Sequence, residues 1–196
     1  FKVFTLHQIQ LFESISNTIS TTLNIQPIRH ILNTSGIFNF SEYQFEMVRL
    51  GIGIYGVGNS EEEQNSLENV STLKSIISQI RTVGANDSVG YSRKFMVKKE
   101  MRIATIPIGY ADGIRRAWGN EKGFVSINNQ EATILGNVCM DMLMVDVTHL
   151  NCAEGDEVII FGENPHVTEI AKICNTIPYE ILTSISQRVK RIFYKN

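Results

Sequence analysis

The sequence predicts an α/β plus β protein, in which a partial α/β (TIM-type) barrel segment is followed by a C-terminal mainly-β domain, a small barrel or sandwich. Three observations predict this fold class. Residues 1–58 alternate between helix-like and strand-like patterns, as the chain of an α/β barrel does. Residues 59–68 are polar and acidic, and from residue 69 onward short strand-like runs predominate.

The N-terminal segment begins with an amphipathic helix. Thr5 and Gln8 have the spacing of a capping box, which predicts that the helix starts there. Apolar residues then recur at steps of three and four, so one face of the helix is apolar. These residues are Ile9, Phe12, Ile15 and Ile19.

Two short apolar runs in the same segment predict buried strands, at residues 28–32 and 51–57. Residues 33–36 are expected to form a loop, and Ser41 is expected to cap a short helix that reaches Met47. A closed parallel barrel needs eight strands, and this segment offers two. Their edges and apolar face would be left open, so we expect that something outside this chain covers them.

The stretch at 59–68 contains almost no apolar side chain to bury, which favours a connector between two domains. The alternative is a solvated loop inside one domain. We therefore divide the chain into a barrel part at 1–58, a linker at 59–68 and a β domain at 69–196.

The β domain is predicted from a set of short strands. Asn128 and Asn129 tolerate positive φ and lie between two apolar runs, which predicts a tight hairpin. The expected strands are 73–83, 103–107, 124–127, 132–135, 143–147 and 157–161, and one helix is expected at about 167–174.

Composition limits the classes of function. The chain has 196 residues and starts at Phe1 rather than Met, so we expect a longer natural polypeptide or a processed product. A formal net charge of −2 gives no reason to expect nucleic acid or an anionic membrane as a partner. No apolar run reaches the ~18 residues that span a bilayer. The cysteines Cys139, Cys152 and Cys174 are widely spaced, without a metal-binding pattern, which favours a reducing cytoplasm.

Six stretches together resemble the alanine racemase family, in the family's order and over nearly the whole chain. They are residues 29–35 (RHILNTS), 47–56 (MVRLGIGIYG), 89–95 (VGYSRKF), 108–113 (IGYADG), 138–141 (VCMD), and 178–180 (PYE) with 188–191 (RVKR). The resemblance implies an eight-stranded α/β barrel followed by a β domain, and a homodimer with shared active sites. It also implies pyridoxal 5'-phosphate as cofactor and alanine as substrate, with D-alanine supplied for peptidoglycan. The barrel half that bears the Schiff-base lysine is not in this chain.

The resemblance assigns the catalytic role to Tyr91, as the base on one face of the substrate Cα, provided by the partner subunit. The lysine serves the other face. A free phenol has a pKa of ~10, so a basic Tyr91 needs positive charge nearby. The alternative is an amphipathic tyrosine at the edge of a strand.

Seven residues match the family's cofactor contacts. Arg49 matches the arginine that faces the pyridine nitrogen, and His30 matches a histidine that contacts this arginine. Each of three residues also has a purely structural interpretation. His30 could be a core histidine beside an apolar strand, Gly51 a close-packed strand glycine, and Tyr179 a buried aromatic residue. The phosphate contacts are implied at Thr34, at the backbone of Gly51 and Ile52, and at Tyr179, and Asn33 is implied as a further contact to the cofactor.

Met140, Tyr110 and Asp141 match residues at the mouth of the site, and the Met140 amide is expected to face the substrate carboxylate. Met140 could instead fill a core. Arg115 and Arg116 could draw a carboxylate inward or form a solvated turn. The chain departs from the family pattern at four positions. Leu32 stands for alanine, Thr34 for serine, Ser92 for glycine and Met142 for glutamine.

Three other classes of protein are alternatives to a racemase. A non-catalytic β domain descended from a racemase, for dimerisation or binding, is favoured by the missing lysine. The presence of Tyr91 and Arg49 favours the enzyme. A small-barrel nucleic-acid binder is disfavoured by the charge. Amino-acid decarboxylases of the same barrel type would bind the cofactor phosphate in the same way, but the 109–113 and 139–141 stretches favour a racemase. We expect this chain alone to be inactive.

Overall fold

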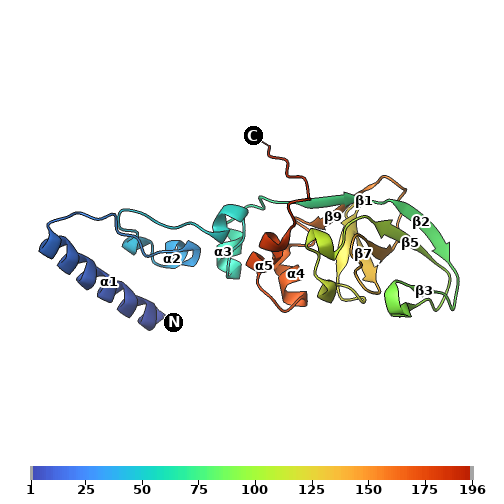
Figure 1. Ribbon diagram of the computed structural model, residues 1–196, viewed down its shortest axis with the longest axis horizontal. Helices are drawn as coiled ribbons and strands as arrows, with labels where there is room; N and C mark the ends of the chain where they lie inside the picture. The colour runs from blue at the N-terminus through green and yellow to red at the C-terminus, as the bar shows by residue number, and fades with distance from the viewer. Residues whose placement is uncertain (1, 195–196) are drawn as a thin grey trace. The chain divides into compact units, whose positions relative to one another are not determined.

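The computed structural model describes residues 2–194, which form two compact units that divide between Val70 and Ser71. The first unit is helical, and the second is built around an antiparallel sheet (Figure 1). This matches the expected fold class of a partial barrel segment followed by a β domain. Within the described residues, no helix is both long enough and apolar enough to cross a membrane.

The first unit opens with α1 (Lys2–Leu23), which starts earlier than the capping box at Thr5 predicted. Ile9 is buried, but Ile15 and Ile19, on the predicted apolar face, are 51% and 43% exposed. The helix therefore has more apolar surface than the rest of its own unit covers.

Neither predicted strand of this unit forms a strand. Residues 28–32 have no ladder partner among the described residues, and residues 51–57 contain the 3-10 helix η2 (Ile52–Tyr55) instead. A strand needs a neighbour to accept its backbone hydrogen bonds, and among the described residues no backbone hydrogen bond joins these two segments. The nearest one runs to the Leu32 carbonyl from the N–H of Arg49, which lies before the second segment. Glycines at positions 51, 53 and 56 also weaken the strand tendency of the second segment.

The loop expected at 33–36 is also wrong, because the structure forms α2 (Thr34–Asn39) there. The Asn33 side chain caps this helix by accepting a hydrogen bond from the Gly36 N–H at 3.0 Å. The helix expected from Ser41 to Met47 is reduced to the 3-10 turn η1 (Ser41–Tyr43), and Phe45 then has a positive φ of 51°.

The stretch expected to connect the two domains contains α3 (Glu61–Asn65). Ser60 caps this helix, and the Glu63 side chain is 5% exposed. The Glu63 carboxylate accepts hydrogen bonds from the Asn59 N–H, the Ser35 hydroxyl and the Asn39 amide. The segment thus buries a hydrogen-bonded carboxylate rather than an apolar side chain, which is why its composition resembled that of a solvated linker.

The second unit is a seven-stranded sheet in the order β1-β9-β6-β7-β8-β5-β2, with every pair antiparallel. The strand bounds are β1 (Leu73–Ile76), β2 (Gln79–Val83), β5 (Met101–Ile106), β6 (Phe124–Ile127), β7 (Gln130–Leu135), β8 (Leu143–Asp146) and β9 (Glu157–Phe161). The predicted strands at 103–107, 124–127, 132–135, 143–147 and 157–161 are confirmed, with small shifts at their ends. The hairpin between β6 and β7 is confirmed as well, since Asn128 and Asn129 have φ of 51° and 61°.

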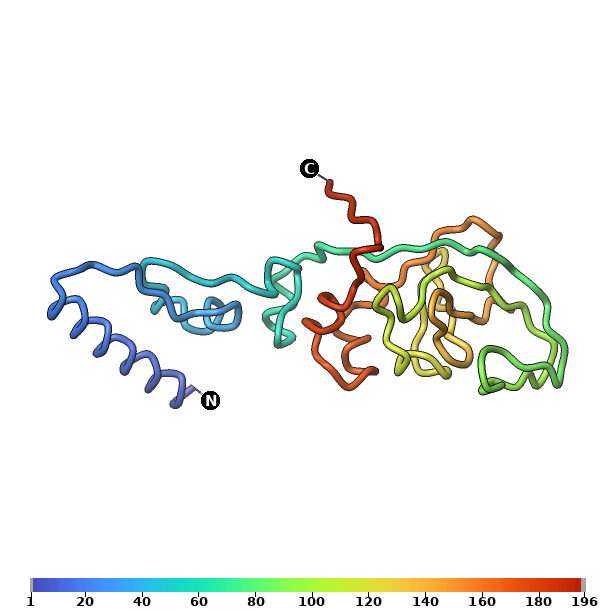
Figure 2. Tube along the Cα trace, viewed as in Figure 1, coloured from blue at the N-terminus to red at the C-terminus, as the bar shows by residue number. Residues whose placement is uncertain are grey.

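The strand predicted at 73–83 is one extended segment that bends at Ile77 and Ser78 (Figure 2). Its first half, β1, pairs with β9 and its second half, β2, pairs with β5. At the bend, the Ile77 N–H donates to the Asp156 carbonyl and the Ser78 N–H to the Thr105 carbonyl, each at 2.9 Å. The first and last strands of the sheet are therefore continuous with each other, which closes the sheet into a small barrel.

A small hairpin and two helices complete the second unit. The hairpin consists of β3 (Ser88–Val89) and β4 (Phe95–Met96), joined by the 3-10 turn η3 (Tyr91–Arg93). The predicted helix at 167–174 is confirmed as α4 (Val167–Ile173), and α5 (Pro178–Ser184) was not predicted. Two more 3-10 turns are η4 (Tyr110–Asp112) and η5 (Arg116–Trp118). The core consists of fully buried aliphatic side chains from the strands, among them Ile103, Ile106, Ile127, Ile134, Leu143 and Ile160.

Candidate active site

The predicted site residues fall into two groups, one in each unit. The first unit holds His30, Asn33, Thr34, Arg49, Gly51 and Ile52, and the second holds Tyr91, Tyr110, Met140, Asp141 and Tyr179.

Thr34 is the centre of the group in the first unit. Its side chain is 1% exposed at the start of α2, and its hydroxyl oxygen accepts hydrogen bonds from the Gly51 N–H at 3.1 Å and the Gly53 N–H at 3.3 Å. A Cβ atom added to Gly53 would lie 2.9 Å from the Thr34 methyl group, so only glycine fits this approach. Because the oxygen already accepts two hydrogen bonds, the hydroxyl proton is left to donate to an acceptor such as an anion.

Arg49 precedes this turn and connects it to residues 31–32 by hydrogen bonds. Its backbone N–H donates to the Leu32 carbonyl at 2.9 Å, and its guanidinium donates to the Ile31 carbonyl at 3.1 Å rather than to His30. The expected contact between His30 and Arg49 is therefore not made by a hydrogen bond among the described residues. His30 is exposed, so within this unit it is not a core histidine.

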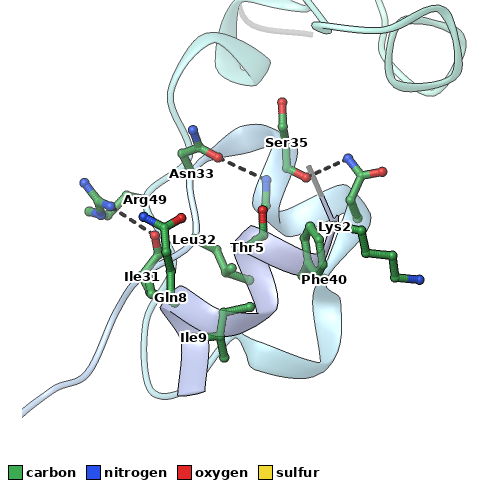
Figure 3. A pocket seen from close by; sticks show the side chains of 12 residues that line it. Lys2, Thr5, Gln8, Ile9, Ile31, Leu32, Asn33, Ser35, Phe40 and Arg49 are labelled. Atoms are coloured by element: carbon green, nitrogen blue, oxygen red, sulfur yellow. Dashed lines mark hydrogen bonds between the residues drawn. The ribbon is translucent and has the colours of Figure 1, made fainter. Parts of the chain in front are cut away.

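An open groove of about 600 Å³ lies between α1 and α2 (Figure 3). Asn33 and Arg49 line it, together with Ile9 and Leu32, but Thr34, Gly51 and Ile52 do not. The Asn33 side chain is held by its cap on α2, and the Arg49 guanidinium by the Ile31 carbonyl, as the dashed lines in Figure 3 show. The groove is thus beside the Thr34 turn, and the turn itself is the part of this unit suited to an anion.

Tyr91 lies at the tip of the β3–β4 hairpin and is 72% exposed. Gly90, Ser92 and Arg93 around it have φ of 74°, 61° and 49°. The left-handed conformation at Ser92 explains why glycine is common there in the resembling family, and the serine adopts it nonetheless. The Tyr91 carbonyl accepts a hydrogen bond from the Asn137 side chain at 3.1 Å, which ties the backbone of this turn to the barrel.

Tyr110, Met140 and Asp141 lie on two neighbouring loops. The Tyr110 N–H donates to the Cys139 carbonyl and the Ala111 N–H to the Met140 carbonyl, both at 2.9 Å. Tyr110 is 44% exposed and Met140 is 53% exposed, so Met140 does not fill the core of this unit. The Asp141 carboxylate accepts a hydrogen bond from Arg188 at 2.5 Å.

Tyr179 is in the first turn of α5 and is 41% exposed, so the alternative of a buried aromatic is wrong within this unit. Its neighbour Glu180 forms an ion pair with Arg115 at 3.1 Å. Both side chains of this pair are more than 40% exposed, which favours the interpretation of Arg115 as part of a solvated charged turn.

Sequence reasoning missed Asp112 and Arg188 as functional candidates. Asp112 is 8% exposed and accepts hydrogen bonds from the Gly109 N–H and from Arg188. Burial by itself raises the pKa of Asp112, but the hydrogen bonds from Arg188 and Gly109 outweigh it and hold the pKa below its ordinary value. The available signal was an aspartate three residues after a glycine in a turn sequence.

Comparison with known proteins gives one consistent result. The family model of the alanine racemase C-terminal domain matches residues 70–193, and that of the N-terminal domain matches residues 2–59. Alanine racemase 1 of Clostridium acetobutylicum is 37% identical over 203 residues, which cover 100% of this chain and 52% of that protein. The chain spans about half the length of the curated relatives it matches.

Solved structures agree with the sequence comparison. The alanine racemase of Clostridium difficile 630 in complex with cycloserine superposes with a TM-score of 0.89 at 33% identity, over 96% of this chain and 51% of that one. The alanine racemase of Bartonella henselae with covalently bound pyridoxal phosphate gives a TM-score of 0.78 at 35% identity, over 87% of this chain and 48% of that one.

Proposed function

Because this chain belongs to the alanine racemase family, we propose that it is the C-terminal part of an alanine racemase, which interconverts L- and D-alanine with pyridoxal 5'-phosphate and supplies D-alanine for peptidoglycan. The natural enzyme is proposed to be a cytoplasmic homodimer with shared active sites. The catalytic assignment rests on one observation. The side chain of Tyr91 is exposed, and the Asn137 side chain holds the backbone of its turn against the β barrel of the second unit.

The described residues fit the proposed cofactor. The Thr34 hydroxyl can donate its proton to a phosphate oxygen, because its oxygen is already occupied by the Gly51 and Gly53 amides. The Gly51 N–H already donates to that hydroxyl, so the proposed backbone donor to the phosphate in this tight turn is the N–H of the next residue, Ile52. Asn33 orders the start of α2 by capping it, and His30 and Tyr179 are kept as further contacts to the cofactor.

Arg49 is proposed to face the ring nitrogen of the cofactor. Its guanidinium does not give up its proton, so it donates a hydrogen bond without protonating the ring. When bound, pyridoxal phosphate makes the substrate Cα–H acidic by accepting the electrons that the departing proton leaves. The Schiff-base lysine is proposed to lie in the part of the barrel outside this chain.

The remaining residues act on the amino acid itself. Tyr91, acting in the partner subunit's site, removes a proton from one face of Cα or returns one to it, and the lysine serves the opposite face. The Met140 amide holds the substrate carboxylate, and Tyr110 and Asp141 form the mouth through which alanine enters. All three lie on loops that backbone hydrogen bonds or Arg188 hold in place.

The test uses the full-length polypeptide that contains this segment, loaded with pyridoxal phosphate. Wild type should racemise alanine, and Tyr91→Phe should bind the cofactor as before but racemise ~10²–10⁴-fold more slowly. One enantiomer should still exchange its α-hydrogen in deuterium oxide with retention, since the lysine remains. The other enantiomer should lose both exchange and inversion. Equal residual exchange from both would remove Tyr91 from the mechanism, and an inactive wild type would favour the non-catalytic alternative.

A further inference from the structure

One side chain joins the two loops that carry Tyr110 and Met140. Arg188 donates from Nε to the Asp112 carboxylate at 2.6 Å and from Nη2 to the Asp141 carboxylate at 2.5 Å. A guanidinium is planar and rigid, so two carboxylates bound to one fork are held in a fixed relation to each other. Arg188 lies 76 residues from Asp112 and 47 from Asp141, so the contact joins three separate parts of the chain.

The Asp112 carboxylate passes this restraint on to its own loop. Its second oxygen accepts a hydrogen bond from the Gly109 N–H at 2.8 Å, which closes the turn that presents Tyr110. Gly109 is packed tightly, because a Cβ atom there would lie 2.4 Å from the carbonyl oxygens of both Cys139 and Met140. The turn therefore rests directly on the backbone of the second loop.

The charges in this cluster are balanced in favour of the ionised forms. The hydrogen bonds that Arg188 donates to Asp112 and Asp141 raise the pKa of its guanidinium, which stays protonated. The Asp141 side chain is 54% exposed, whereas the Asp112 side chain is 12% exposed. The contact between Arg188 and Asp112 is thus the buried half of the cluster.

We propose that Arg188 is a positioning residue for substrate binding, which sets the distance between Tyr110 and the Met140 amide without touching the substrate itself. This proposal rests on the proposed function, since it assigns the two loops to the substrate carboxylate and to the mouth of the site. Loss of the fork lets the loops move apart by a fraction of an ångström to an ångström, and displacements of that size weaken a precisely placed contact.

The test compares Arg188→Met with Arg191→Met in the full-length enzyme. Arg191 is a matched control, because it lies in the same C-terminal segment but donates only to backbone carbonyls. Arg188→Met should raise the KM for alanine about tenfold and change kcat by less than about threefold. Arg191→Met should change neither by more than about twofold, and Arg188→Lys should recover part of the KM. Affinity for pyridoxal phosphate should be unchanged in all three.

A merely structural role would give a different pattern, with a smaller active fraction that lowers kcat and leaves KM in place. That result, or an unchanged KM in Arg188→Met, would overturn the proposal. If Arg188→Met does not fold, Arg188→Lys and Asp112→Asn test the same fork, and both should raise KM more than they lower kcat.

Amide hydrogen exchange provides a second test of the proposal, which does not depend on measuring racemisation. In Arg188→Met the Tyr110 and Ala111 amides, which bond to the Cys139 and Met140 carbonyls, should exchange faster, while the β6 and β9 amides should not. Faster exchange in a protein that does not racemise alanine would sink the proposed function but keep the restraint on the two loops. Unchanged exchange at these two amides would sink the restraint itself.

Discussion

The Thr34 hydroxyl offers a test in which stability and cofactor binding can be separated. Thr34→Val keeps the shape of the side chain but removes the oxygen that accepts the Gly51 and Gly53 amides. Gly53 is half-buried and its amide would lose its acceptor, at a cost of ~1–3 kcal/mol. Gly51 is exposed and its amide can turn to water, so its loss costs less. We expect the variant to lose about 2 kcal/mol of unfolding free energy.

The affinity of Thr34→Val for pyridoxal phosphate should fall by more than the weakened turn alone explains. A hydrogen bond to a charged acceptor is worth ~1.5–3 kcal/mol, so the missing donor should weaken pyridoxal phosphate binding roughly 10- to 100-fold. The matched control is Thr34→Ser, which keeps the oxygen and loses one buried methyl group, at ~1 kcal/mol. Urea denaturation measures the first effect, and titration of the full-length apoenzyme with cofactor measures the second. Cofactor affinity of the valine variant within about twofold of the serine variant would refute a role for this hydroxyl at the phosphate.

Three further predictions concern the chain as it stands. The 196-residue chain, incubated with pyridoxal phosphate and reduced with borohydride, should give no specific covalent adduct by intact-mass analysis, and a single modified lysine would contradict the placement of the Schiff-base lysine outside it. Hydrogen exchange should be faster in residues 2–58 than in residues 71–194 if the chain is monomeric, because α1 leaves its apolar face exposed, and equal protection in a proven monomer would contradict this. Burial lowers the pKa of His166, so as the pH falls the unfolded state binds a proton before the folded state does, and the contribution of His166 to the unfolding free energy should be constant above pH ~6.5 and fall below it. His166→Asn keeps a cap on α4 and should flatten that pH dependence in thermal unfolding, whereas an unchanged slope would assign it to other groups.

The parts of the fold that the sequence predicted are those set by local chemistry. Asn128 and Asn129 tolerate positive φ in a two-residue turn, and the strands on either side of them alternate as a hairpin requires. The strands of the first unit were predicted wrongly because the apolar pattern indicates only that a segment is buried between neighbours. Those neighbours are not among the described residues, so the segments at 28–32 and 51–57 do not pair.

The bend at Ile77 shows another limit of local reasoning. The pattern at 73–83 predicted one long strand and is correct as a description of the backbone, but its two halves pair with β9 and β5. Which strand lies beside each half is decided by partners far along the chain. The link from Arg188 to Asp112 was missed for the same reason, since a charged residue 76 positions away carries no local signal of its partner.

The two units differ in how far the chain itself determines their part of the proposed site. In the second unit the continuous β1–β2 segment joins the two ends of the strand order, and the loops rest on a core formed within this unit. Each of Tyr91, Tyr110 and Met140 is held by a hydrogen bond to its own backbone, from the Asn137 side chain at Tyr91 and between the two loops at Tyr110 and Met140. In the first unit the Thr34 turn is ordered locally by capping and by glycine, while the apolar face of α1 and the unpaired segments lack partners within that unit. Under the proposed function, the groups that handle substrate and proton are therefore preformed in this chain, whereas the cofactor cradle becomes complete only when the rest of the barrel is present.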